Sequence, residues 1–167
     1  GIPMLFMGQE FLEDKQWSDD VESQPQLLLH WAGLAGGDRQ MLDHLRCMRE
    51  LIALRWRFPG LRGEGVRVVH ADDGDRVLAF HRWVVGQGDD VLVVAHLGNF
   101  NRFGYRIGFP GGGRWREVFN SDVYENWVNP GVVGNGGAIH AEPWGLHGFG
   151  FSASLLLPAN SILVFAR

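Results

Sequence analysis

The pattern of apolar and polar positions changes twice along the chain. Residues Ile2 to Met7 carry apolar side chains, and this run stops at Gly8, before an amide and a carboxylate. Such a run is typical of a strand that is buried on both faces and delivers polar groups to a rim. A strand of this kind needs a neighbour on each side, and nothing earlier in the sequence supplies one. We therefore expect the 167 residues to be the tail of a longer protein.

Residues 12–37 follow neither a helical nor a strand period and are rich in acidic side chains. They predict a long loop, which is either functional or a solvated acidic surface. A helical stripe follows, because Met41, Leu45, Met48 and Ile52 recur at spacings of four, three and four, and Leu42 and Leu51 join them. Asp38 is a suitable N-cap and Phe58-Pro59-Gly60 a suitable end, so a helix is predicted from Asp38 to Arg57.

After Gly60 the pattern alternates, as in β-strands. Three runs separated by turn residues predict a meander, and two further pairs of runs predict two hairpins. A loop of about 30 residues with one short strand separates these pairs. The expected strands cover residues 66–70, 76–83, 91–97, 105–109, 115–119, 138–140, 152–157 and 161–166. The fold class expected is therefore mainly β, an antiparallel two-layer β-sandwich.

Composition narrows the classes of function. Apolar residues make up 46% of the chain and charged residues 20%, with a net charge of −4, as in soluble globular proteins. The basic residues form no cluster, which disfavours a nucleic-acid partner. The sequence holds neither a run of about 18 apolar residues nor a leader, so we expect no membrane span. The single cysteine, Cys47, favours the reducing cytoplasm.

Candidate chemistry is sparse. The histidines have no metal-ligand spacing, no GxSxG nucleophile motif occurs, and the glycine-rich stretch 131–137 lacks the lysine of a phosphate loop. We therefore predict no metal site and no cofactor. Carboxylates crowd the first loop, but charge runs are usually solvated. The seven tryptophans are either core residues or sugar platforms, and the core is the commoner use.

Five segments together closely resemble the C-terminal part of 1,4-α-glucan branching enzymes, in the α-amylase clan of glycoside hydrolases. They are residues 4–11 (MLFMGQEF), 58–62 (FPGLR), 77–83 (VLAFHRW), 105–110 (YRIGFP) and 114–122 (RWREVFNSD). The resemblance implies that residues 1–60 hold the last strand and helix of an incomplete (β/α)8 barrel. It further implies that residues 61–167 form the all-β C-terminal domain.

The resemblance also implies a function. Branching enzymes transfer an α-1,4-glucan segment of glycogen or starch to a 6-hydroxyl through a covalent glycosyl-enzyme. Their catalytic carboxylates follow earlier barrel strands, so no residue of this chain is expected to be catalytic. At the end of a barrel strand, Met7, Gln9 and Glu10 are expected to line the glucan cleft, with Trp17 as a stacking residue. Alternatively, Gln9 and Glu10 only hold the rim loops by hydrogen bonds.

Two rival functions remain open at this point. The chain is a glucan-binding or barrel-packing module, or it belongs to a hydrolytic or debranching enzyme of the same clan. Aromatic side chains on an exposed face of the sandwich favour binding, and buried ones favour packing. The expected partners are an α-1,4-glucan and the missing barrel segment. Without that segment, residues 1–35 are expected to pack onto the sandwich, pair with another copy, or rearrange.

Overall fold

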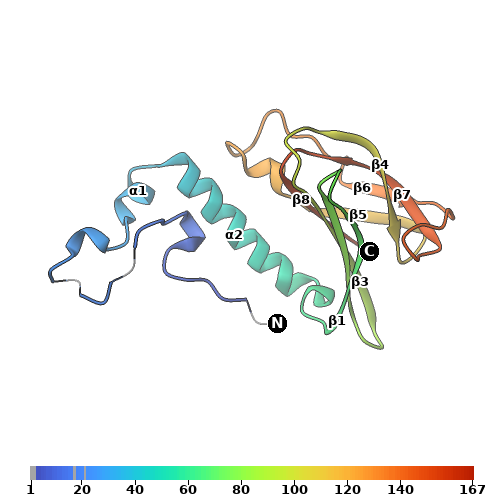
Figure 1. The fold of residues 1–167 in the computed structure, drawn as a ribbon, viewed down its shortest axis with the longest axis horizontal. Helices are drawn as coiled ribbons and strands as arrows, with labels where there is room; N and C mark the ends of the chain where they lie inside the picture. Colours follow the sequence, from blue (N-terminus) through green and yellow to red (C-terminus); the bar gives the residue numbers. More distant parts are fainter. Residues whose placement is uncertain (1–2, 17, 21) are drawn as a thin grey trace.

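The computed structural model describes residues 3–16, 18–20 and 22–167, and shows a long helix beside a two-layer β-sandwich (Figure 1). Short helices precede the long one and follow its end. The helical elements of the described chain are η1 (Gln9–Phe11), η2 (Pro25–Leu27), α1 (Trp31–Ala35), α2 (Arg39–Arg57), η3 (Pro59–Leu61) and η4 (Ser121–Tyr124). Among the described residues, no helix combines the length and apolarity needed to cross a membrane.

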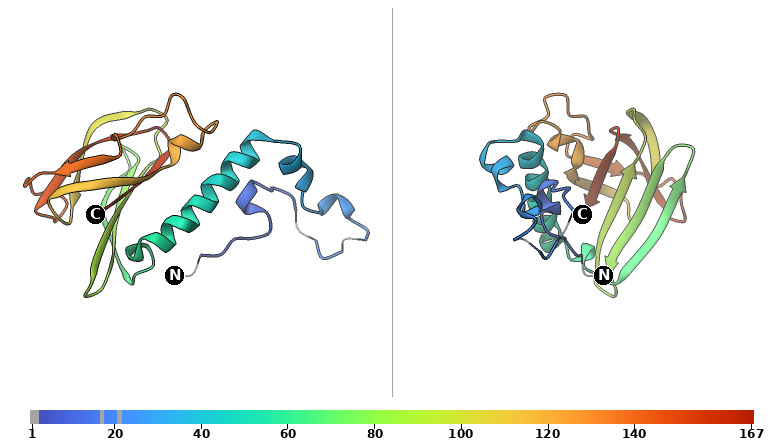
Figure 2. Two further views of the ribbon diagram at one scale, coloured as in Figure 1. Left: turned by 180° about the vertical axis from the view of Figure 1, so that it is seen from behind. Right: turned by 60° about the vertical axis from the view of Figure 1, so that its left-hand side comes forward.

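The strands form two antiparallel sheets (Figure 2). One sheet has six strands in the order β1-β2-β3-β8-β5-β6, and the other pairs β4 with β7. The strand bounds are β1 (Gly65–Asp72), β2 (Val77–Val84), β3 (Gly88–His96), β4 (Arg102–Phe109), β5 (Gly113–Asn120), β6 (Ala138–Ala141), β7 (Phe151–Leu157) and β8 (Ser161–Ala166). The predicted antiparallel, mainly β fold is confirmed, as are the meander and the short strand near residue 138.

Both later hairpin predictions are wrong. β4 pairs with β7, whereas β5 pairs with β6 and β8, so neither β4–β5 nor β7–β8 is a hairpin. The glycines before β5 let the chain cross between layers, and Gly113 has a φ of 90° that side chains disfavour. The crossing brings Phe109 and Trp115 into one core, with ring centres 5.2 Å apart. Burying these large rings between the two sheets outweighs the local hairpin.

The sandwich core lies between the two sheets. Its largest fully buried side chains include Trp115, Phe109, Phe165 and Leu163, which come from β4, β5 and β8. The fully buried His96 donates a hydrogen bond from Nδ1 to a backbone carbonyl at 2.7 Å, which satisfies this nitrogen away from water. Trp115 is thus a core residue, the use that the sequence favours for tryptophan.

Helix α2 begins and ends as predicted. The Asp38 carboxylate caps it by accepting a hydrogen bond from the Met41 N–H at 3.1 Å, and the helix stops before Pro59. Of the predicted stripe, however, Leu51 is the member found in this contact with the sandwich. Cys47, Leu51, Leu54 and Phe58 pack against the outer face of the six-stranded sheet, together with residues such as Val91, Val93 and Val164.

The opening strand is also a wrong prediction over its described part. Residues 3–6 are unpaired, residues 7 and 8 form a turn, and η1 follows. Met4 is 82% exposed, and Leu5, Phe6 and Met7 are about half exposed. A strand buried on both faces needs strands on either side, and the described residues offer none here. The predicted loop 12–37 contains η2 and α1, and Ile2 lies outside the described residues.

Candidate functional site

The sequence-predicted site residues lie at the turn that opens η1. Gly8 has a φ of 88°, and a side chain there would meet the Glu13 side chain. Gln9 Oε1 accepts a hydrogen bond from the Phe6 N–H at 2.9 Å, and its carbonyl lies 3.2 Å from His44 Nε2. Gln9 therefore ties this segment together and links it to α2. A glucan contact stays a prediction for Met7, which is exposed, and for Gln9 and Glu10. Trp17 lies outside the described residues.

The segment around η1 is anchored by Phe11. This ring is 1% exposed and lies 5.1 Å from the ring of Trp31 in α1. The anchored segment lies beside α2, on the side away from the two sheets (Figures 1 and 2). Over the described residues the predicted strand is absent and the segment packs on the helix, while pairing with another copy stays a prediction.

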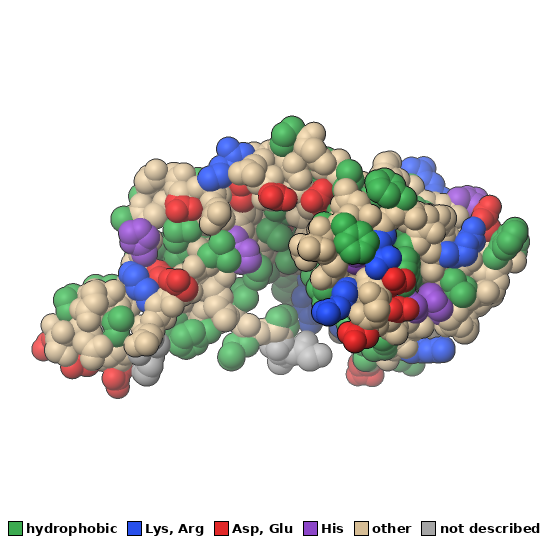
Figure 3. Space-filling model, turned by 45° about the horizontal axis from the view of Figure 1, so that its top comes forward, with side chains coloured by type: hydrophobic (Ala, Val, Ile, Leu, Met, Phe, Trp, Pro, Cys, Tyr) green, Lys and Arg blue, Asp and Glu red, His purple; other side chains and the backbone are tan. Residues whose placement is uncertain are grey.

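Helix α2 consequently has two apolar faces. One face is the stripe that packs on the sheet. The second carries the regularly spaced residues of the predicted stripe together with Trp56, and lies about 130° around the helix from the first at 3.6 residues per turn. Its first part is half-buried at Met41, Leu45 and Met48, but its last part is open, with Ile52 47% and Trp56 69% exposed. Hydrophobic side chains also gather around the hollow between the N-terminal segment and the sandwich (Figure 3).

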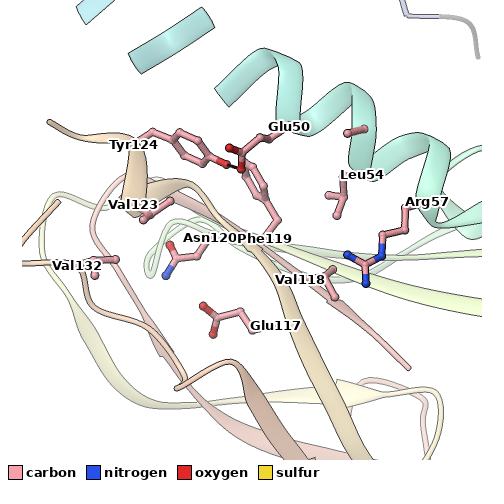
Figure 4. Close-up of a pocket in the computed structure, with 11 residues that line it drawn as sticks. Glu50, Leu54, Arg57, Glu117, Val118, Phe119, Asn120, Val123, Tyr124 and Val132 are labelled. Atoms are coloured by element: carbon pink, nitrogen blue, oxygen red, sulfur yellow. Dashed lines mark hydrogen bonds between the residues drawn. The ribbon is translucent and has the colours of Figure 1, made fainter. Parts of the chain in front are cut away.

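A groove of about 490 Å³ separates α2 from β5 and η4 (Figure 4). Several of its polar groups are engaged with each other or with the backbone. Tyr124 donates a hydrogen bond from its hydroxyl to the Glu50 carboxylate, and burial followed by this bond raises the pKa of Tyr124. Glu117 accepts a hydrogen bond from the Asn135 N–H at 2.8 Å, and Asn120 donates to a carbonyl at 2.8 Å. These contacts fix the walls of the groove.

An aromatic stack clamps α2 to the sandwich. Phe119, Tyr124 and Trp127 stack in order, with ring centres 5.6 and 5.2 Å apart. The guanidinium of Arg46 lies 4.5 Å from the centre of the Trp127 ring, and the buried Asp43 carboxylate accepts the Trp127 N–H at 3.0 Å. Sequence reasoning missed this stack, although the aromatic residues within the otherwise polar loop 120–148 were a usable signal.

The described part of the chain shows neither a cluster of metal-ligand side chains nor an activated thiol. No three histidine, cysteine, aspartate or glutamate side chains gather there as they would to hold a metal ion. Cys47 is half-buried in the helix–sheet contact, and burial followed by the Glu50 charge raises the pKa of its thiol to about 11. A thiol of that pKa is a weak nucleophile near neutral pH.

Residues 68–167 match the family described as alpha amylase, C-terminal all-beta domain. The chain belongs to this family. A solved structure agrees on the fold: the crystal structure of a MutB mutant in complex with glucose matches with a TM-score of 0.50 at 18% identity, over 91% of this chain and 24% of that one. In this all-β domain, the matched region begins within β1 and contains every later strand.

Curated relatives extend the similarity to the N-terminal segment. The 1,4-alpha-glucan branching enzyme GlgB of Burkholderia thailandensis is 37% identical over 99% of this chain and 19% of its own length. GlgB 1 of Xanthomonas campestris pv. campestris is 35% identical over 99% and 22%, and GlgB of Paramagnetospirillum magneticum 34% identical over 100% and 22%. The chain therefore spans about a fifth of the length of these relatives.

Proposed function

We propose that this chain is the C-terminal part of a 1,4-α-glucan branching enzyme, in which α2 joins the all-β domain to a (β/α)8 barrel. The relatives named as branching enzymes match nearly the whole chain, including the residues before the all-β domain. Because they are about five times longer, the rest of such an enzyme has room for a barrel. We also propose that residues 1–60 belong to the barrel and residues 61–167 to the all-β domain.

The single observation that carries the proposal is the second apolar face of α2. A helix with two separate apolar faces is normally buried on both. One face is covered by the six-stranded sheet, while Ile52 and Trp56 on the other remain exposed. The exposed side chains of Met4, Leu5 and Phe6 lie in the segment that would supply a barrel strand. Both features are explained if a barrel covers them.

The proposed chemistry takes place mostly outside this chain. The barrel supplies the carboxylates that cleave an α-1,4 linkage and pass the glucan to a 6-hydroxyl. In this chain, Met7 and Glu10 stand at the end of the segment that becomes the last barrel strand, at the rim where glucan binds. Gln9 holds that rim through its contacts with Phe6 and His44. The chain alone is not expected to branch glucan.

A chimera tests the proposal. In the Burkholderia thailandensis enzyme, the matched C-terminal region is replaced by this whole chain, and a shortened form of the same enzyme ends before that region. Branching is followed by the loss of the amylose–iodine absorbance. We expect the chimera to branch amylose, and the shortened enzyme and this chain alone to be inactive. A chimera that folds, as judged by circular dichroism and gel filtration, yet leaves amylose unbranched would overturn the proposal.

A further inference from the structure

We infer that the outer face of the β4–β7 sheet carries a binding platform for linear α-1,4-glucan, centred on Trp144. The Trp144 side chain is 65% exposed although its neighbourhood is well ordered by hydrogen bonds. An exposed indole that is held in place in this way offers a flat apolar face on which a sugar ring can stack. This inference rests on the proposed function, because that function supplies the glucan.

The backbone around Trp144 is built to hold the ring in place. Its N–H donates to the Glu142 carbonyl at 2.7 Å, and Glu142 exchanges two backbone hydrogen bonds with Ser152 of β7, at 2.9 and 3.0 Å. Further along, Leu146 and Phe149 exchange two bonds of 3.0 Å, which close the loop. A ring on so constrained a loop loses little conformational entropy when a ligand stacks on it.

Polar groups suited to sugar hydroxyls lie beside the ring. The Arg106 guanidinium is 5.5 Å from the ring centre of Trp144. It donates to Glu142 Oε2 at 3.3 Å and to Ser152 Oγ at 3.0 Å, so its fork is oriented. A glucose unit presents an apolar C–H face and an equatorial rim of hydroxyls. The indole suits the first, and the arginine–glutamate pair, partly exposed, can donate to and accept from the second.

The strip beside Arg106 is low enough to admit an extended chain. Arg106 faces the outer side of β4, and Gly104 lies on the same side, near Ser154, whereas Leu146 covers the backbone at Gly108. Position 104 is glycine, and a Cβ placed there would lie 3.7 Å from Ser154 Oγ, the nearest group. Arg106 pairs with Ser154 in the register, so small side chains border the guanidinium. A glucan lying on Trp144 can therefore continue past Arg106 toward Gly104.

The position of the platform fits its proposed role. Helix α2 packs on the outer face of the six-stranded sheet, whereas β4 and β7 form the other layer. Figure 1 shows these two strands on the far side of the sandwich from α2. A barrel that covers the second face of α2 would thus leave Trp144 open. The platform can hold a glucan while the barrel acts on another part of it.

Native gel electrophoresis with and without dissolved amylopectin tests this inference on the whole 167-residue chain. The matched variants are Trp144→Ala and Trp56→Ala. Trp56 is 69% exposed and has the Arg62 guanidinium 4.9 Å from its ring centre, so it is a similar ring on the α2 side. We expect the parent and Trp56→Ala to be retarded by amylopectin, and Trp144→Ala to bind about tenfold more weakly, as loss of one stacked ring predicts.

Two controls keep the result interpretable. Trp144→Ala should keep the parent's thermal midpoint, because the ring is exposed, and gels with dextran should not retard any form. The inference would be overturned if amylopectin retarded Trp144→Ala as much as the parent, or did not retard the parent at all. Equal retardation by dextran would also overturn it. The branching chimera is read separately, so loss of glucan binding with an active chimera sinks only this inference, and the reverse result sinks only the proposed function.

Discussion

The two faces of α2 should respond very differently to the same truncation. Leu54 faces the sheet and is 8% exposed, whereas Ile52 lies on the second face and is 47% exposed. Both are aliphatic residues of the same helix, two positions apart. Replacing each by alanine in the isolated chain therefore compares a covered face with an open one, at nearly constant helix position.

The expected magnitudes follow from burial. Leu54→Ala removes buried methyl groups and leaves a cavity, which costs about 3 kcal/mol, near the lower part of the measured range because Leu54 borders the groove. Ile52→Ala forfeits about half of the roughly 2 kcal/mol that full burial gives, without a cavity term. Alanine's better helix propensity returns about 0.4 kcal/mol. The net cost is about 0.6 kcal/mol, so the variants differ by about 2.4 kcal/mol.

Urea unfolding, followed by tryptophan fluorescence and by circular dichroism, measures this difference. For an m-value of about 2 kcal/mol/M, the Leu54→Ala midpoint should lie about 1 M or more below that of Ile52→Ala, with unchanged slopes. Equal losses from the two substitutions would refute the reasoning. In that case the second face would already be covered in the isolated chain, either by its own N-terminal segment or by another copy.

Three further predictions concern local features. Gly60→Ala should lower the free energy of unfolding in urea by about 1–3 kcal/mol, because its Cβ would lie 2.0 Å from the Asp89 carbonyl oxygen. Gly150→Ala should leave this free energy unchanged, because its Cβ would meet open space. Equal losses from the two substitutions would contradict this prediction. Burial, and secondly the charge of His70, lower the pKa of His147 below its ordinary value of 6.5. The folded state therefore favours the neutral ring, and the stability of the fold should fall as the pH drops below about 6.5 toward the folded pKa. The thermal midpoint should therefore change less between pH 7.5 and 5.5 in His147→Asn than in the parent chain. Equal changes in the two proteins would refute the role given to His147. Cys47, with a pKa near 11, should react with a disulfide reagent at pH 8 much more slowly in the folded chain than in urea, and similar rates would contradict its burial.

Local signals in the sequence predict what local physics decides. Helix α2 and the β1–β3 meander are predicted because capping residues, periodicity and turn residues act over a few positions. The two hairpin predictions are wrong because core packing decides whether a strand pairs with its neighbour in the sequence or with a distant strand. Phe109 and Trp115 reach a common core only when β4 and β5 separate. Pairing between residues as distant along the chain as Arg102 and Leu157 has no local signal.

The candidate site is less predictable still. An apolar run such as Ile2 to Met7 indicates that a strand would need neighbouring strands. The run itself cannot show whether such neighbours are present, and its described part is unpaired here. The periodicity of α2 identified an apolar stripe but could not say that the helix meets the sheet through Leu51 together with residues outside that stripe. Likewise, nothing in the sequence separates exposed Trp144 from buried Trp115, because exposure is set by the layer on which each lies.

The most direct test of the central claim is the content of α-1,6 linkages, measured by proton NMR, in amylose treated with the chimera and its variants. If the second face of α2 joins this domain to a barrel, Ile52→Glu combined with Trp56→Glu should lower the linkages formed by at least about tenfold, because charges would be buried in that contact. The Leu97→Glu chimera, altered at a 64% exposed residue after β3, should match the parent chimera. Branching by the double variant at the parent rate, or no α-1,6 linkage from a folded parent chimera, would contradict the account.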